Sequence, residues 1–205
     1  AQAGGDARFE REARVAASLS HPNIVPVHHF GELHDGRPFM SMAFLDGGSL
    51  RDRLQARGAC AVEEALAIAR QLASALQAAH ARNVIHRDLK PDNVMFQGET
   101  AVLTDFGIAK VADAAALTGT GVNPGTLKYF SPEQAQSKPL DQRSDLYALG
   151  VVLYEMLTGH CPTEAGSLAG YLYQIAFQPP TPLPPALAGL QPLLDRLLVK
   201  HPAAR

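Results

Sequence analysis

The residues from Asp145 to Thr158 would form a helix that is apolar on nearly all sides, and Gly159 follows them directly. Glycine often ends a helix because it adopts the left-handed backbone conformation without strain. A helix without a polar face must be covered by the rest of its chain, so we expect this one, capped by Ser144, to be deeply buried. Its apolar stretch, residues 146–157, includes Glu155 and is too short to span a bilayer.

The first part of the chain has the pattern of a helix followed by two strands. Phe9–Leu19 has apolar residues at helical spacing. Ile24–Phe30 and Pro38–Leu45 are strand-like runs on either side of the turn-rich His34–Arg37, a pattern that predicts an antiparallel hairpin. Residues 46–48, Asp-Gly-Gly, then interrupt the pattern.

The rest of the chain is mainly helical. Ser49 can cap a short helix, with Asp52 at the capping-box position. The further elements that we expect are a helix at Val62–Ala81, short strands at Val94–Phe96 and Ala101–Leu103, and a final helix at Leu190–Val199. Pro179–Pro185 is expected to be a connecting loop, with a polyproline ligand for a partner domain as the alternative.

Composition excludes several classes of function. The 205 residues have a net charge of −2, so no basic field indicates a nucleic-acid partner or contact of this segment with a membrane. The two cysteines, Cys60 and Cys161, lack metal-ligand spacing, and we expect reduced thiols and a cytoplasmic location. The histidines show no zinc-ligand pattern either. A membrane anchor elsewhere in the parent protein stays open.

Three motifs carry chemistry: His86-Arg-Asp-Leu-Lys-Pro-Asp-Asn93, then Asp105-Phe-Gly107, then Ser131-Pro-Glu133. Phosphoryl transfer needs a carboxylate near the attacking hydroxyl, oxygen ligands for magnesium, and cations near the transferred group. The first two motifs supply these residue types on loops at strand ends, where they can converge. The residues concerned are Asp88, Lys90, Asn93 and Asp105.

In this order and at this spacing, the motifs resemble those of eukaryotic-type (Hanks-type) protein kinases, and the surrounding sequence resembles the bacterial serine/threonine branch. The resemblance covers essentially the whole chain. It implies an α+β, two-lobed kinase fold, with residues 1–45 as an incomplete N-lobe (a helix and a hairpin) and residues 46–205 as the C-lobe. It also implies ATP as phosphoryl donor, Mg²⁺ as cofactor, and serine or threonine hydroxyls of proteins as acceptors.

The resemblance assigns catalytic roles by position. Asp88 would be the base or orienting carboxylate for the acceptor hydroxyl, and Lys90 would neutralise charge on the transferred phosphoryl group. Lysine two residues after that aspartate is the serine/threonine pattern. Asn93 and Asp105 would hold magnesium.

It likewise implies a nucleotide site. Met42 occupies the gatekeeper position, the backbone of residues 43–45 (Ala43 to Leu45) would bond adenine, and Met95 would form the floor of the pocket. Glu12 matches the glutamate that orients the ATP-clamping lysine. In the family a Gly-rich loop and that lysine precede this helix, whereas the first lysine here is Lys90. We therefore expect the chain alone to be inactive.

Regulatory and structural residues follow from the same resemblance. Arg87 would bind a phosphate on Thr118 or Thr120, with solvated loop residues as the alternative, and Thr126 would contact Asp88 and Lys90. A homodimer would allow autophosphorylation. Two structural contacts are also expected: Asp145 with the catalytic-loop backbone, and Glu133 with Arg205.

Two other functions remain open at this point. A pseudokinase would keep the fold as a binding module without chemistry, although intact Asp88, Lys90, Asn93 and Asp105 disfavour it. A small-molecule kinase of the aminoglycoside type would share the catalytic aspartate and asparagine. The segment from Asp105 to Glu133, which resembles a peptide-docking activation loop, disfavours that alternative.

Overall fold

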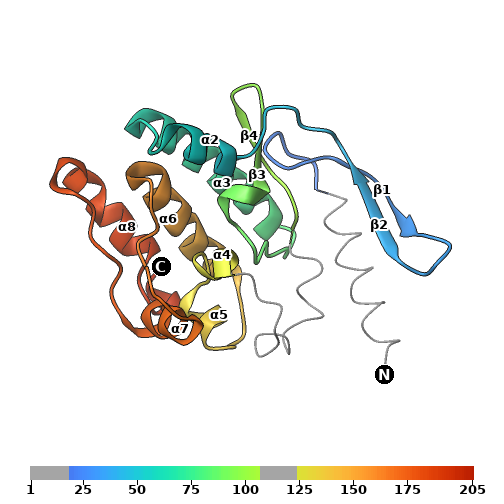
Figure 1. The fold of residues 1–205 in the computed structure, drawn as a ribbon. Helices are drawn as coiled ribbons and strands as arrows, with labels where there is room; N and C mark the ends of the chain where they lie inside the picture. The colour runs from blue at the N-terminus through green and yellow to red at the C-terminus, as the bar shows by residue number, and fades with distance from the viewer. Residues whose placement is uncertain (1–18, 107–123) are drawn as a thin grey trace.

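A computed structural model describes residues 19–106 and 124–205 (Figure 1). The helix expected at Phe9–Leu19, with Glu12, and the threonines Thr118 and Thr120 therefore lie outside the described residues, apart from Leu19. In Figure 1 a strand hairpin lies at one side of the molecule and most of the helices at the other, with two short strands between them. This arrangement agrees with a small strand-rich part joined to a larger helical part.

The hairpin consists of β1 (Val27–Glu32) and β2 (Pro38–Met42), which pair antiparallel. It is shorter than expected, because Ile24 and Val25 lie outside it. Ile24 instead forms an isolated parallel bridge with Leu103, and the carbonyl of Leu103 accepts a 3.0 Å hydrogen bond from the N–H of Val25. Pro26 separates the two pairings because it has no N–H to donate.

Two helices follow the connector. α2 (Leu50–Arg57) begins at the expected capping box, in which the side chains of Ser49 and Asp52 each bond the other residue's backbone N–H. α3 (Val62–His80) buries one face against the main core. Leu66 and Ala69 lie beside this face and are only partly buried. The buried residues of α3 are Ala65, Ile68, Leu72, Ala75, Leu76 and Ala79.

The two central strands, β3 (Val94–Gln97) and β4 (Thr100–Leu103), form an antiparallel pair directly after the short 3₁₀ helix η1 (Pro91–Asn93). Apart from Gln97 and Thr100 beside the turn, their side chains are at least partly buried, and β4 packs against α3. The strands therefore fix the loops that precede and follow them.

α6 (Gln142–Thr158) is the buried central helix that the sequence predicts (Figure 1). It begins earlier than expected, and its cap is Asp141, whose side chain accepts from the N–H of Arg143 at 2.8 Å. Ser144, the expected cap, lies inside the first turn and donates to Glu133 instead. Gly159 ends the helix with a φ of 79°, in the left-handed conformation.

The remaining described elements are α4 (Pro124–Leu127), α5 (Pro132–Ala135), α7 (Leu168–Phe177), η4 (Pro185–Leu190), α8 (Gln191–Leu197) and η5 (Pro202–Ala204). Among them, α8 packs against α6, and α7 packs against α5. The expected final helix is shorter, because Leu190 belongs to the 3₁₀ helix before it and the helix ends at Leu197. Residues 179–184 form no regular element. No helix among the described residues is long and apolar enough to cross a membrane.

Gly150 marks a close approach of α6 to α8. A Cβ at this position would lie 2.8 Å from Leu197 Cβ and 2.9 Å from Leu198 Cδ2. We predict that Gly150→Ala lowers the free energy of unfolding by about 1–3 kcal/mol, because overpacking forces the two helices apart. Urea denaturation would measure this. Gly189→Ala is the matched control, since nothing lies within 4 Å of the methyl carbon that it would add. Equal stability of both variants would contradict the prediction.

Candidate active site

The loop that carries the first motif is held by one buried carboxylate. Asp145, 1% exposed, accepts hydrogen bonds from the N–H groups of His86 and Arg87, both at 2.9 Å. This is the expected contact with the loop backbone. Asp145 also lies 2.7 Å from Nε2 of His80, a partner that the sequence did not indicate. The carboxylate thus fixes the loop where Arg87 has a left-handed φ of 67°.

His86 links this loop to the second motif. Its Nε2 lies 2.8 Å from the carbonyl of Thr104, and its Nδ1 accepts the N–H of Asp88 at 3.2 Å. Burial lowers its pKa, so the ring is neutral and Nε2–H is the donor. The ring also contacts the ring of Phe106 at a centroid distance of 4.7 Å. His86 therefore fixes the distance between the two motif loops.

Four of the expected site residues converge on one point. Lys90 Nζ lies 3.2 Å from Asp88 Oδ2 and 3.3 Å from Thr126 Oγ1. Asn93 Nδ2 donates to the backbone carbonyl of Asp88 at 2.9 Å and approaches its Oδ2 at 3.4 Å. The carboxylate of Asp88 and the hydroxyl of Thr126 thus both contact the ammonium group of Lys90, and Asp88 and Lys90 are partly exposed to solvent.

Asn93 and Asp105 lie at the same end of the antiparallel β3–β4 pair, Asn93 directly before β3 and Asp105 two residues after β4. Thr104 joins them, because its N–H and Oγ1 donate to the carbonyl of Asn93 at 2.9 and 3.2 Å and its Oγ1 lies 3.5 Å from Asp105 Oδ2. Since the amide nitrogen of Asn93 bonds Asp88, its oxygen is the atom left to act as a ligand. One amide oxygen and one carboxylate suit Mg²⁺, which keeps several waters and takes further oxygens from substrate phosphates.

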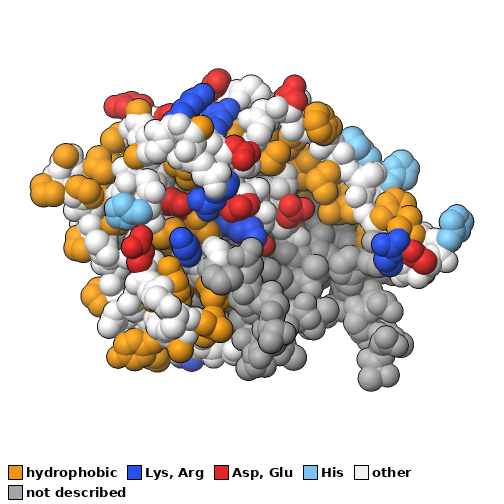
Figure 2. Space-filling model, viewed as in Figure 1, with side chains coloured by type: hydrophobic (Ala, Val, Ile, Leu, Met, Phe, Trp, Pro, Cys, Tyr) orange, Lys and Arg blue, Asp and Glu red, His pale blue; other side chains and the backbone are white. Residues whose placement is uncertain are grey.

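An all-protein metal site is not found in the described ranges, 19–106 and 124–205. They contain no group of three or more His, Cys, Asp or Glu side chains able to hold a metal ion. Figure 2 shows histidines over the β1–β2 hairpin, where His28, His29 and His34 are exposed. A magnesium ion held by Asn93 and Asp105 would therefore need oxygens from a nucleotide to complete its coordination.

The residues expected at the adenine site also gather in one place. Met42, Ala43 and Met95 pack around the buried side chains of Val25, Leu45 and Val102. The N–H of Ala43 is engaged with the carbonyl of Pro26 at 2.9 Å. A ligand would therefore bond the backbone carbonyl of Ala43 and not its N–H.

Comparisons with known proteins identify the family of the chain. The family model described as "Protein kinase domain" matches residues 2–205. The chain belongs to the protein kinase domain family. It is 40% identical over 215 residues to the serine/threonine-protein kinase pkn3 of Myxococcus xanthus, and 42% identical over 208 residues to the serine/threonine-protein kinase PknD of Mycobacterium tuberculosis. It is also 40% identical over 198 residues to the serine/threonine-protein kinase PknB of Mycobacterium leprae.

These alignments include 94–97% of this kinase domain but only part of each relative. The chain spans 39% of the length of pkn3, 31% of PknD and 32% of PknB. The similarity to bacterial serine/threonine kinases that the sequence motifs indicate is therefore confirmed for the domain.

The third motif of the kinase domain is tied to the first. Gln134 Nε2 donates to the carbonyl of Arg87 at 2.9 Å, and Ser131 caps α5 through a reciprocal capping box with Gln134. The Ser131 hydroxyl accepts the N–H of Gln134, so the serine helps to orient the side chain that holds Arg87.

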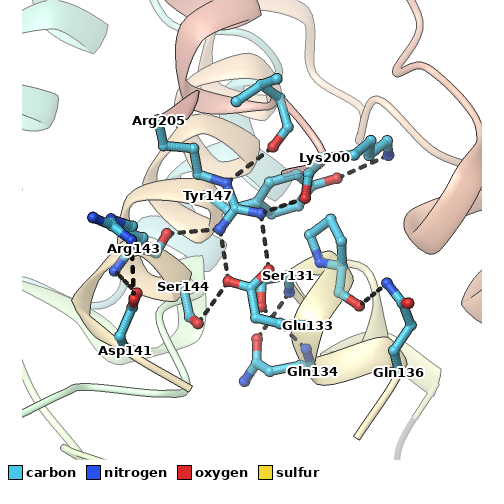
Figure 3. A network of polar contacts seen from close by, with 12 residues as sticks. Ser131, Glu133, Gln134, Gln136, Asp141, Arg143, Ser144, Tyr147, Lys200 and Arg205 are labelled. Atoms are coloured by element: carbon cyan, nitrogen blue, oxygen red, sulfur yellow. Dashed lines mark hydrogen bonds and ion pairs between the residues drawn. The ribbon is translucent and has the colours of Figure 1, made fainter. Parts of the chain in front are cut away.

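The expected ion pair of the kinase domain forms (Figure 3). Arg205 Nη1 and Nη2 donate to the two oxygens of Glu133 at 2.6 and 2.8 Å, and Ser144 donates to Glu133 Oε1 at 2.7 Å. The Arg205 side chain is 0% exposed and lies over the ring of Tyr147. It also donates to three backbone carbonyls, those of Arg143, Val199 and Lys200.

Lys200 lies beside this pair, and its burial leads us to predict that the stability of the fold depends on pH. Its Nζ donates to neutral acceptors, including the carbonyl of Ile175 at 2.8 Å, and burial followed by the nearby Arg205 lowers its pKa from 10.5 to about 8. From pH 8 to 10.5 the unfolded chain keeps this proton and the folded chain does not, so wild type should gain stability relative to Lys200→Met as pH rises.

We expect a relative gain of about 0.5–1 kcal/mol, well below the full shift because Lys200 is partly exposed to solvent. Urea denaturation of both proteins at pH 7 and pH 10 gives the difference, and taking it between the two proteins cancels the titration of tyrosines and cysteines. A relative loss of stability on raising the pH would show that the ammonium is stabilised in the fold.

Proposed function

We propose that the protein transfers the γ-phosphoryl group of ATP to serine or threonine hydroxyls of other proteins. The observation that carries the proposal is the contact of Lys90 with both Asp88 and Thr126. It brings together a carboxylate, a cation and a segment able to seat a peptide. The names of the related kinases support the choice of serine and threonine as acceptors.

In this mechanism Asp88 accepts a hydrogen bond from the acceptor hydroxyl and orients it toward the phosphorus atom. Lys90, already 3.2 Å from Asp88, neutralises charge that develops on the transferred oxygens. Asn93 and Asp105 would hold Mg²⁺, which when bound neutralises the phosphates of ATP. The hydrogen bonds of Asn93 and His86 to Asp88 hold the carboxylate loop in place for this step.

The nucleotide would bind on the hairpin side of these residues. The carbonyl of Ala43 and the N–H of Leu45 would bond adenine, with Met42 at the gatekeeper position and Met95 as the floor of the pocket. Glu12 would orient a lysine that clamps the phosphates. These residues supply shape and backbone polarity, while the catalytic-loop residues supply charge.

Transfer of label from γ-labelled ATP tests the function directly. The full-length protein would be incubated with a generic protein acceptor, and the labelled amino acids would be separated after hydrolysis. We expect Mg²⁺-dependent label on phosphoserine and phosphothreonine. Binding of ATP without transfer would instead identify a pseudokinase, and transfer only to small molecules would identify the aminoglycoside type.

We also expect control by phosphorylation of Thr118 or Thr120, between two copies of the chain. Either phosphate would add about −1.5 to −2 charge and could bond Arg87, which would hold Thr126 in its contact with Lys90. Mass spectrometry of the active full-length protein should find phosphate on at least one of them, and alanine at both should slow transfer to other proteins. Full activity of the double-alanine variant would exclude this control, while the kinase function would stand.

A further inference from the structure

A closed ring of hydrogen bonds joins three elements near the candidate site. Arg51 of α2 donates through Nη1 to Glu155 Oε1 of α6 at 2.7 Å and through Nη2 to the hydroxyl of Tyr129. Tyr129 donates in turn to Glu155 Oε2 at 2.6 Å. The Tyr129 residue is 4% exposed and the Glu155 side chain 8% exposed, so the ring is largely shielded from water.

The ring supplies hydrogen-bond partners for a buried carboxylate of the central helix α6. Glu155 is a carboxylate on a helix that is buried nearly all round, and a buried carboxylate is costly unless it is paired and hydrogen-bonded. Burial, with the nearby thiol of Cys161 and Glu155, raises the pKa of Tyr129, so its phenol stays neutral and can donate. Burial opposes the charge on Arg51, yet its bonds to Glu155 and Tyr129 raise its pKa above the ordinary value.

Two further contacts connect the ring to the motif loops. Arg51 Nε lies 3.5 Å from Oδ2 of Asp92, a residue of the catalytic loop. At the other corner, the N–H of Tyr129 donates to the carbonyl of Thr126 at 3.3 Å, and Thr126 is the partner of Lys90. One guanidinium therefore connects the loop that carries the catalytic groups with the segment that lies against them.

We propose that Arg51 is a positioning residue for the protein acceptor, and this inference rests on the proposed function. By holding Tyr129, it fixes the segment from Thr126 to Phe130 at the distance from Lys90 at which an acceptor hydroxyl can reach Asp88. The contacts of the ring described above run to this acceptor side, whereas the adenine cluster around Met42 is a separate group of side chains. Loss of the ring should therefore weaken use of the acceptor far more than use of ATP.

Steady-state kinetics of the full-length protein test this with Arg51→Met. We expect the KM for the protein acceptor to rise at least about tenfold while the KM for ATP changes less than about twofold. Tyr129→Phe keeps the ion pair and removes only the hydroxyl, so it should raise the acceptor KM about threefold. Arg53→Met is the matched control on the same helix, because Arg53 lies over the ring of Phe96 and bonds the carbonyl of Gly98. It should leave both constants unchanged.

Equal rises of both KM values would overturn the inference, because they would indicate general loosening of the fold. An unchanged acceptor KM in Tyr129→Phe and Arg51→Met would overturn it as well. Hydrogen exchange of residues 126–130 gives a readout independent of turnover: protection should fall in Tyr129→Phe and stay as in wild type in Arg53→Met. Unchanged protection in Tyr129→Phe would reject the positioning role, whereas absence of transfer by the wild type would reject the proposed function instead.

Discussion

Asp88→Asn and Asp105→Asn should each lower the rate of phosphoryl transfer by about 10²-fold or more. The first variant removes the carboxylate that orients the acceptor hydroxyl, and the second removes the charged ligand proposed for Mg²⁺. Neither residue is in the apolar core, and Asp105 is exposed, so both variants should fold. The measurement is labelled-phosphate transfer by the full-length protein, with circular dichroism to check folding.

Asp195→Asn is the control for these variants, because Asp195 is an exposed carboxylate on α8 that bonds only Gln191 among the described side chains. It should retain the wild-type rate. The two active-site variants should also differ in their response to magnesium, since Asp105→Asn alone changes a metal ligand. Near-normal rates in both, with folding intact, would remove the proposed roles of Asp88 and Asp105.

The second large effect concerns stability. Glu133→Gln should lower the free energy of unfolding by about 3–5 kcal/mol, because it leaves the guanidinium of Arg205 buried without its counter-ion. Burial tends to raise the pKa of Glu133, but hydrogen bonds from Arg205 and Ser144 hold it below its ordinary value, so the carboxylate is charged at neutral pH. Urea denaturation at pH 7 measures the loss.

Glu99→Gln is the matched control, since Glu99 is an exposed carboxylate in the β3–β4 turn. Its effect should stay within about 0.5 kcal/mol, as for ordinary surface changes. If Glu133→Gln is no more destabilising than Glu99→Gln, the hydrogen bonds of Arg205 to backbone carbonyls are enough to keep its side chain in place. The Glu133–Arg205 ion pair would then contribute little to the free energy of unfolding.

Local patterns predicted much of the site. Asp88, Lys90 and Asn93 lie within one short stretch, so their spacing along the chain already limits how far apart they can be. The capping box at Ser49 and the left-handed Gly159 are also local, because each depends on a few adjacent residues. Contacts of this kind leave a readable signal in sequence.

Contacts between distant elements left a weaker signal. The ring of Arg51, Tyr129 and Glu155 joins residues up to 104 positions apart, and no local pattern links them. Glu155 was the one residue whose position indicated such a contact, since a buried charge on an otherwise apolar helix needs a partner. Ser144 was misplaced as a cap because serine and aspartate are both good caps, and only the fold shows that Ser144 is used by Glu133.

The Glu133–Arg205 pair has a consequence for the order in which the domain is made. The two residues are 72 positions apart, and a ribosome adds about 5–20 residues per second, so Glu133 waits roughly 4–14 s for its partner. Throughout that interval the Glu133 carboxylate lacks its guanidinium partner, so burying it costs more than leaving it in water. The newly made helical lobe should therefore stay open to chaperones and proteases until Arg205 has emerged.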